Sequence, residues 1–365
     1  MTKKDKILIA IGGTGGHVFP GCNLAEHLIG ENFHVELVSD KRGQRYLKKY
    51  GDLKTTILPS TPLISKNIFL YFFSILIILY SSFYSLIFLI WKRPSIIFGM
   101  GGYSSFPICI MASILRIKFI IYENNLVLGK ANKYLLPFCK KILVSNKELE
   151  GIPSKYSSKV VEIGNIIDKK IFNFSKITSK NLNGKLIKIL IIGGSQAAKI
   201  FAEVLPNIFR KCFNQGINFK IYQHCLPDQK KKLKDFYEKS KIDCETFHFS
   251  DNLIEYFLKV NLAITRSGSS MISELTNAHI PFISVPLPSS AENHQLKNAM
   301  YYERKKLAFL IEEKDLNDKL LYLIKDIYED RSKLDKIINN QRQYSDKNVY
   351  ENINQILKKI INEKN

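Results

Sequence analysis

Short apolar runs alternate with segments of helical periodicity along most of the chain. The runs are bounded by glycine or polar residues, which is typical of strands buried in a parallel sheet. In the first half they lie at 7–11, 34–39, 95–99, 119–122 and 142–145, with helical patterns over 19–29 and 106–115. This alternation predicts an α/β domain with a doubly wound parallel sheet.

The same order of elements begins again after a polar stretch at 168–185. A strand at 188–192, a glycine turn and a helix at 197–213 repeat the unit at 7–29. Two copies of one unit predict two doubly wound Rossmann-like domains that face each other across a cleft. We expect an N-terminal domain at 1–164, a linker at 165–187, a C-terminal domain at 188–340, and a last helix at 341–365 that packs back on the N-terminal domain.

Residues 67–91 carry no charge and are flanked by basic residues on both sides. Their length and hydropathy suit a transmembrane helix, but a span would put the glycine loop at 12–16 and the strand at 95–98 on opposite sides of a bilayer. The serines and tyrosines of the segment suit the headgroup region of a membrane. We predict a helix, broken near Ser81 and Ser82, that partly covers the sheet and partly lies on the membrane. A simply buried helix and a true span are the alternatives.

The length and composition agree with two folded domains. The chain has 365 residues, of which 45% are hydrophobic, and a net charge of +21. The charge favours an anionic partner, whether nucleic acid, an acidic membrane surface or a phosphorylated ligand, although lysine is abundant throughout. The six cysteines have no zinc-binding spacing and indicate reduced thiols in the cytoplasm.

The first glycine turn, Gly12-Gly-Thr-Gly-Gly-His17, connects a strand to a helix, as in phosphate-binding α/β units. The dinucleotide fingerprint would need a third glycine at Val18. Asp40 nevertheless follows the second strand, at the position where a dehydrogenase has the acidic residue that binds the ribose of its cofactor. A dehydrogenase therefore remains an alternative on this evidence.

A second phosphate-binding pattern occurs at 261–278. Arg266-Ser-Gly268 turns the chain after a strand, and Ser269 and Ser270 stand where a helix N-cap is expected. The first-turn amides of a helix stabilise an anion, and Glu274, one turn further on, could bind the ribose diol of a nucleotide. The plainer alternative makes Ser269 only a cap and Glu274 a solvated charge.

The sequence has no D-x-D triplet and no G-x-S-x-G serine elbow. Many nucleotide-sugar transferases hold a metal through D-x-D to stabilise the departing diphosphate. Its absence favours a metal-free solution, in which a helix N-terminus and cations stabilise that charge. We therefore expect no cofactor and no essential metal.

Six motifs together resemble the MurG family of peptidoglycan N-acetylglucosaminyltransferases, in order and spacing over nearly the whole chain. They are Gly12–His17 with Pro20, Gly101-Gly-Tyr103, Tyr122-Glu-Asn-Asn125, Gly193-Gly-Ser-Gln196, Arg266-Ser-Gly268 with Glu274, and His294-Gln295 before Asn298-Ala299.

This resemblance implies a GT-B fold and inverting transfer of N-acetylglucosamine from UDP to an undecaprenyl-pyrophosphoryl-N-acetylmuramyl-pentapeptide, forming a β-1,4 linkage. It also implies peripheral docking of 67–93 on the anionic cytoplasmic face of the bacterial inner membrane, and no nucleic-acid partner. The alternatives are a lipid glucosyltransferase, a UDP-N-acetylglucosamine 2-epimerase or a non-catalytic nucleotide-binding protein.

The resemblance also implies roles for individual residues. Glu274 would hold the ribose, and Asn125 and Gln295 would read the sugar hydroxyls. His17, Tyr103 and Asn132 would line the acceptor side. The full set of implied donor contacts is Thr14, Gly15, Gly16, Asn125, Ser195, Ser250, Ser269, Ser270, Met271, Ile272, Ser273, Glu274 and Gln295.

Inverting transfer needs a general base at the acceptor hydroxyl. His17 is our candidate because histidine exchanges protons near neutral pH, and Glu123 is the reserve. A structural role of His17 in bracing the glycine loop is the alternative. The chain departs from the family at Asp168, where an arginine is expected, at Met271, where a threonine is expected, and at Tyr122-Glu-Asn-Asn125, where the family has His-Glu-Gln-Asn.

Overall fold

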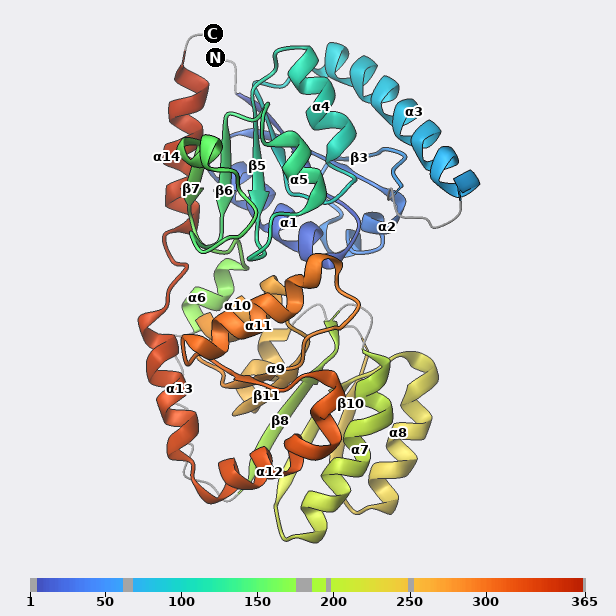
Figure 1. Ribbon diagram of the computed structural model, residues 1–365, viewed down its shortest axis with the longest axis vertical. Coiled ribbons are helices and arrows are strands. Elements are labelled where there is room, and N and C mark those ends of the chain that lie inside the picture. Colours follow the sequence, from blue (N-terminus) through green and yellow to red (C-terminus); the bar gives the residue numbers. More distant parts are fainter. Residues whose placement is uncertain (1–4, 62–67, 175–185, 195–197, 249–252, 364–365) are drawn as a thin grey trace. The chain divides into compact units, whose positions relative to one another are not determined.

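The computed structural model describes residues 5–61, 68–174, 186–194, 198–248 and 253–363. The chain forms two compact units (Figure 1). Unit 1 comprises Met1–Ile167 and Asp346–Asn365, and unit 2 comprises Asp168–Ser345. Each unit contains one parallel sheet with connecting helices, so the predicted class of two doubly wound α/β domains is confirmed.

Unit 1 is built on a seven-stranded sheet in the order β3-β2-β1-β4-β5-β6-β7. Its central strands β1, β4, β5 and β6 are apolar runs rich in Ile, Leu, Val and Phe and are buried on both faces, whereas the edge strands β3 and β7 are only partly buried. The elements are β1 (Lys6–Ala10), α1 (Gly15–Gly30), β2 (His34–Ser39), α2 (Lys41–Gln44), η1 (Lys48–Tyr50), β3 (Thr55–Ile57), α3 (Ile68–Lys92), β4 (Ile96–Gly99), α4 (Phe106–Ile114), β5 (Phe119–Glu123), α5 (Lys130–Leu135), β6 (Lys141–Val144), η2 (Ser154–Lys159), β7 (Val160–Glu162) and α14 (Val349–Asn362).

Unit 2 is built on a six-stranded sheet in the order β10-β9-β8-β11-β12-β13. Its elements are α6 (Lys169–Phe174), β8 (Ile187–Ile192), α7 (Lys199–Asn214), β9 (Phe219–His224), α8 (Pro227–Lys239), β10 (Asp243–Phe247), α9 (Leu253–Lys259), β11 (Leu262–Thr265), α10 (Ser269–Asn277), β12 (Phe282–Ser284), η4 (Ala291–Asn293), α11 (His294–Arg304), β13 (Phe309–Leu310), η5 (Glu313–Asp315), α12 (Leu316–Glu329) and α13 (Ser332–Gln343).

Both sheets reverse their strand order at the first strand. In unit 1 the order changes direction between β1 and β4, and in unit 2 between β8 and β11. Loops that leave the carboxyl ends of two such strands diverge to opposite faces of the sheet and leave room for a ligand. The glycine turns found in the sequence follow these four strands, so the fold brings them together in pairs.

The C-terminal helix α14 packs on unit 1. Asn354 Oδ1 lies 3.0 Å from His27 Nε2, and Lys118 Nζ donates to the carbonyl of Ile360 at 3.0 Å. The Tyr350 hydroxyl donates to the carbonyl of Ile167. These contacts join the last element of the chain to the first half of the sequence. The predicted linker at 165–187 is divided between the units: it belongs to unit 1 up to Ile167 and to unit 2 from Asp168, with 169–174 forming α6. Unit 2 ends at Ser345, five residues after the predicted end of the C-terminal domain.

Helix α3 is continuous from Ile68 to Lys92, so the predicted break near Ser81 and Ser82 is wrong. No glycine or proline interrupts it, and a serine can remain inside a helix by bonding to its own backbone, as Ser74 Oγ does to the carbonyl of Leu70 at 2.8 Å. Ser74, Ser81 and Ser85 are buried, and α3 contacts α4 (Figure 1). The protein side of this helix is therefore formed by these serines together with the buried Phe88 and Leu89.

The opposite side of α3 consists of large apolar side chains in solvent. Phe69 is 81% exposed and Trp91 80%. Only 28% of its most apolar 18-residue stretch is buried. Among the described residues, α3 is the only helix that is long and apolar enough to cross a membrane. A simply buried helix, one of the sequence alternatives, is therefore excluded.

Candidate active site

The two glycine loops of unit 1 meet around His17. A Cβ atom added at Gly101 would lie 3.2 Å from Cε1 of His17, and one at Gly102 would lie 3.2 Å from Cδ2. Both glycines have positive φ, 87° and 72°, which favours glycine for a second reason. The loop after β4 thus forms a close wall against the imidazole, and the fold brings His17 together with the loop that carries Tyr103.

Helix α1 begins at Gly15, four residues earlier than predicted, and this places His17 in its first turn. Thr14 is exposed and extended and makes no side-chain cap. The His17 amide bonds to the Thr14 carbonyl at 3.1 Å. The amides of Gly15 and Gly16 come before this bond, at the start of the helix, where backbone amides favour an anion. The predicted contact residues Thr14 and Gly16 are both exposed at this point.

Asp40 is buried and holds the first glycine loop in place. Its carboxylate accepts hydrogen bonds from the amides of Gly13 at 3.0 Å and Gly43 at 2.7 Å, and from the Ser60 hydroxyl at 2.9 Å. Burial alone would raise its pKa, but these donors and the Arg42 guanidinium hold the pKa below the ordinary value. The carboxylate already accepts these hydrogen bonds and Asp40 is 2% exposed, so it cannot bind the ribose of a cofactor. The dehydrogenase alternative therefore loses its support.

Glu123, the reserve base, is also a structural carboxylate. It accepts hydrogen bonds from the Gly129 amide at 2.9 Å, from Asn132 Nδ2 at 3.0 Å, and from the backbone and side-chain nitrogens of Asn125 at 3.2 and 3.1 Å. It is 3% exposed. Four donors leave little capacity for a proton from a substrate, so the geometry favours His17 over Glu123.

The loop after β5 braces the start of α1. Asn124 Nδ2 donates to the carbonyl of Gly16 at 3.0 Å, and Asn125 Nδ2 donates to Asn124 Oδ1 at 3.0 Å. Asn132 Nδ2 donates to the Tyr122 carbonyl at 2.9 Å, while its Oδ1 is buried and has no hydrogen-bond partner among the described residues. Asn125 and Asn132 therefore lie beside the loop that carries His17.

The corresponding loop of unit 2 leads from β11 into α10. Gly268 is extended and is the N-cap, and the Ile272 amide bonds to its carbonyl at 3.2 Å. Ser269 and Ser270 are therefore the first helical residues, and their predicted role as N-caps is wrong.

The donor side chains predicted on α10 differ in accessibility. Ile272 and Ser273 are fully buried and Ser269 is 8% exposed, so the first two contribute to packing and cannot touch a ligand through their side chains. Ser270, Met271 and Glu274 are partly exposed. The helix therefore presents its first-turn backbone, Met271 and Glu274.

Arg266 is the cation nearest to this turn in sequence, but it is fully engaged in packing. Its Nη1 donates to the carbonyls of Val285 at 3.3 Å and Pro286 at 3.2 Å. Its Nη2 pairs with Glu313, and the guanidinium lies 5.1 Å from the centre of the Phe201 ring. Arg266 thus ties the ends of β11 and β12 together and is not positioned to bind phosphate.

Two further predicted residues have local partners. Gln295 lies in the first turn of α11, and its Oε1 accepts the Leu287 amide at 3.0 Å. Asp168, which replaces the family arginine, accepts the Lys170 amide at 2.9 Å and caps the start of α6. Ser195 and Ser250 lie outside the described residues.

Sequence reasoning missed His224 and His248, which follow or end strands at the same edge of unit 2. His224 is the last residue of β9 and is 8% exposed. Burial, and then the nearby His248, lower its pKa to about 4. The only available signal was a histidine at the end of a strand or directly after one, and this signal alone does not distinguish a packing role from a binding role.

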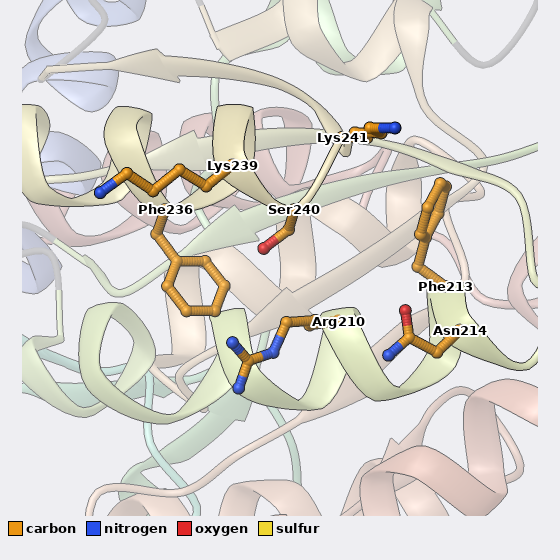
Figure 2. A pocket seen from close by; sticks show the side chains of 7 residues that line it. All are labelled: Arg210, Phe213, Asn214, Phe236, Lys239, Ser240 and Lys241. Atoms are coloured by element: carbon orange, nitrogen blue, oxygen red, sulfur yellow. The ribbon is translucent and has the colours of Figure 1, made fainter.

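A pocket of about 360 Å³ lies elsewhere on unit 2 (Figure 2). It is formed by the last turns of α7 and α8 and includes Arg210, Phe213, Phe236 and Lys239. These turns lead into the amino ends of β9 and β10, whereas the glycine loops follow carboxyl ends. The pocket is therefore separate from the candidate site. Within the part of the chain that the structure describes, no group of three or more His, Cys, Asp or Glu residues is arranged to hold a metal.

Comparison with known proteins assigns both halves of the chain. Residues 7–144 match the glycosyltransferase family 28 N-terminal domain, and 188–356 match its C-terminal domain. A protein of Pelagibacter ubique (strain HTCC1062) named UDP-N-acetylglucosamine--N-acetylmuramyl-(pentapeptide) pyrophosphoryl-undecaprenol N-acetylglucosamine transferase is 33% identical over 98% of this chain and 99% of its own. The protein of that name from Rickettsia canadensis (strain McKiel) is 36% identical over 90% of this chain and 93% of its own.

Solved structures agree on the fold. Acinetobacter baumannii MurG has a TM-score of 0.77 at 20% identity and covers 97% of this chain and 99% of its own. A UDP-N-acetylglucosamine 2-epimerase from Listeria monocytogenes has a TM-score of 0.66 at 14% identity, covering 100% and 98%. The fold is thus shared with epimerases, but the sequence relatives are transferases. The chain belongs to glycosyltransferase family 28 and, within it, to the MurG family of N-acetylglucosamine transferases.

Proposed function

We propose that this hexosyltransferase of peptidoglycan synthesis transfers N-acetylglucosamine in one inverting step in which His17 is the general base. The imidazole would accept the proton of the C4 hydroxyl of the N-acetylmuramyl acceptor as that oxygen attacks C1 of the donor sugar. The bond between C1 and the diphosphate oxygen breaks on the opposite face, UDP leaves, and the new linkage is β-1,4.

The confinement of the His17 ring supports its role as the general base. Its ring is held at the switch point of unit 1 by two glycines that leave no room for a side chain, while the residue itself is partly exposed. A base must be fixed in direction and still reach the substrate. Glu123, with four donors on its carboxylate, meets only the first requirement.

We assign the UDP donor to the switch point of unit 2. The first-turn amides of α10 and the helix dipole would stabilise the charge that develops on the departing diphosphate. Glu274 would accept hydrogen bonds from the ribose hydroxyls, and Gln295 Nε2 would contact the sugar. Because these groups can stabilise the leaving charge, we propose that no metal ion is essential.

We further propose that α3 docks the protein on the anionic cytoplasmic face of the membrane that holds the lipid acceptor. The helix buries three serines, Phe88 and Leu89 against the protein and exposes most of its large apolar residues, whereas the exposed face of a soluble amphipathic helix is polar. Ile114 on α4 and Tyr134 on α5 are further exposed apolar side chains of unit 1, 64% and 68% exposed. Exposed Arg93 and Arg116 would attract anionic lipids.

Replacement of the base tests the mechanism. We expect His17→Asn to lower kcat by about 10² or more while the KM for UDP-N-acetylglucosamine changes less than about threefold. The matched control is His34→Asn, because His34 is exposed at the start of β2. A kcat within about twofold of wild type for His17→Asn would remove His17 from the chemistry.

A further inference from the structure

Arg42 lies beside the first glycine loop, in the short helix α2. Its Nη2 is 3.2 Å from Asp40 Oδ2, and its guanidinium lies 4.5 Å from the centre of the Tyr103 ring. A Cβ atom at Gly13 would be 3.3 Å from the same Nη2. The guanidinium is therefore fixed between the loop after β1 and the loop after β4.

This arginine is not used up by its partners. The side chain is 37% exposed, and a guanidinium has five N–H donors, of which one pairing to Asp40 uses only a part. Asp40 in turn is occupied by two backbone amides and a serine hydroxyl. The carboxylate therefore orients the cation and leaves its outer edge able to bind a second anion.

Ser104 provides an independent sign of a ligand at this place. It is 6% exposed, and its Oγ has no hydrogen-bond partner among the described residues. The same Oγ lies 2.4 Å from the position of a Cβ atom at Gly12, so it points at the glycine loop. A buried hydroxyl without a partner is costly unless a ligand or water completes it.

We propose that Arg42 is a positioning residue that binds the pyrophosphoryl group of the lipid acceptor, above the Gly12–Gly16 loop. This inference rests on the proposed function, which supplies an acceptor with two phosphates in series. A guanidinium can bridge two phosphate oxygens with paired hydrogen bonds, and the start of α1 adds backbone donors. Tyr103 would hold the plane of the guanidinium, which gives that residue an acceptor-side role without direct contact.

The test compares two acceptors and three variants. The acceptors are the natural pyrophosphoryl lipid and an otherwise identical monophosphoryl lipid. The variants are Arg42→Met, Arg42→Lys and, as matched control, Lys41→Met, since Lys41 is the exposed neighbour on α2. We expect Arg42→Met to raise the KM for the pyrophosphoryl acceptor about tenfold or more with the donor KM unchanged, Arg42→Lys to lie between, and Lys41→Met to match wild type.

Non-additivity separates binding from a merely structural effect. If Arg42 contacts the second phosphate, Arg42→Met should reduce kcat/KM for the monophosphoryl acceptor by less than about twofold. This acceptor has no second phosphate, so the substitution removes no contact with it. Equal losses with both acceptors, or no loss with either, would overturn the proposal.

A binding measurement keeps this proposal separate from the transfer mechanism. Undecaprenyl pyrophosphate in detergent is titrated into wild-type and Arg42→Met protein whose thermal unfolding midpoints agree. We expect about tenfold weaker binding to the variant, and a smaller difference with undecaprenyl monophosphate. Equal binding to both proteins would refute the role of Arg42, whereas failed transfer with the expected binding difference would count against the proposed function alone.

Discussion

His224 is an imidazole that the fold keeps neutral. Its pKa falls from 6.5 to about 4 because of burial and then the nearby His248. Between these two values the unfolded chain binds a proton that the folded chain does not, so stability should be complete above pH 6.5 and fall as the pH drops toward 4. The loss at pH 4 is about 3 kcal/mol.

Replacing His224 with glutamine should flatten this pH dependence. The measurement is urea unfolding of wild type and His224→Gln at several pH values between 7 and 4, with His34→Gln as the control at an exposed histidine. If the wild type and His224→Gln lose stability equally over this range, His224 is not a buried neutral group.

Glu274 should determine donor affinity rather than chemistry. Its carboxylate lies one turn into α10 and is partly exposed, beside the amides that we assign to the diphosphate. We expect Glu274→Gln to raise the KM for UDP-N-acetylglucosamine about tenfold with a smaller change in kcat. Glu303→Gln, at an exposed position of α11, is the control. An unchanged donor KM would end the ribose assignment.

Individual roles were the hardest feature to predict from sequence. Arg266 and Asp40 stand at positions that suit phosphate and ribose, yet the structure closes both with internal partners. Those partners lie in other elements or across a turn, and no spacing rule announces them. Arg42 is the opposite case: its local sequence does not distinguish it from its exposed neighbours, and only the structure places it beside the glycine loop.

At the scale of elements, α3 makes a sharp prediction about the membrane. Single lysine substitutions at Phe72 and Phe83, 61% and 62% exposed, should reduce sedimentation with vesicles rich in anionic lipid, because each buries a charge in the apolar boundary. The matched control is Tyr322→Lys on α12, a large side chain that is 71% exposed in unit 2. Wild-type protein that stays in vesicles after an alkaline wash would contradict peripheral docking and favour a span.

Strands were predicted more accurately than helix starts. Buried parallel strands are continuous apolar runs, and 34–39 matches β2 residue for residue. Helices α1 and α10 both begin earlier than predicted, at Gly15 and Ser269, because loop-like glycine and serine also fit the first turn of a helix. The break predicted in α3 failed because the segment holds no glycine or proline, and Ser81 stays inside the helix although its buried Oγ has no hydrogen-bond partner among the described residues.

At the scale of the molecule, the repeated strand, glycine turn and helix predicted the two α/β domains, and the family assignment agrees. Contacts that join distant parts of the chain were not readable. Asp346 accepts the Asn165 amide at 3.0 Å, and the Tyr122 hydroxyl accepts the Ile166 amide at 3.1 Å. Both contacts join residues far apart in the sequence and hold 165–166 in unit 1. The boundary between Ile167 and Asp168 therefore has no local signal in the sequence.

We expect this chain to transfer the sugar to a pyrophosphoryl lipid without an essential metal. The most direct measurement incubates the purified protein with labelled UDP-N-acetylglucosamine, vesicles that contain the undecaprenyl-pyrophosphoryl acceptor, and EDTA. We predict label in the organic phase as a disaccharide lipid, with one UDP released per sugar transferred. Label that stays in the aqueous phase, as unchanged or epimerised nucleotide sugar, would contradict the account.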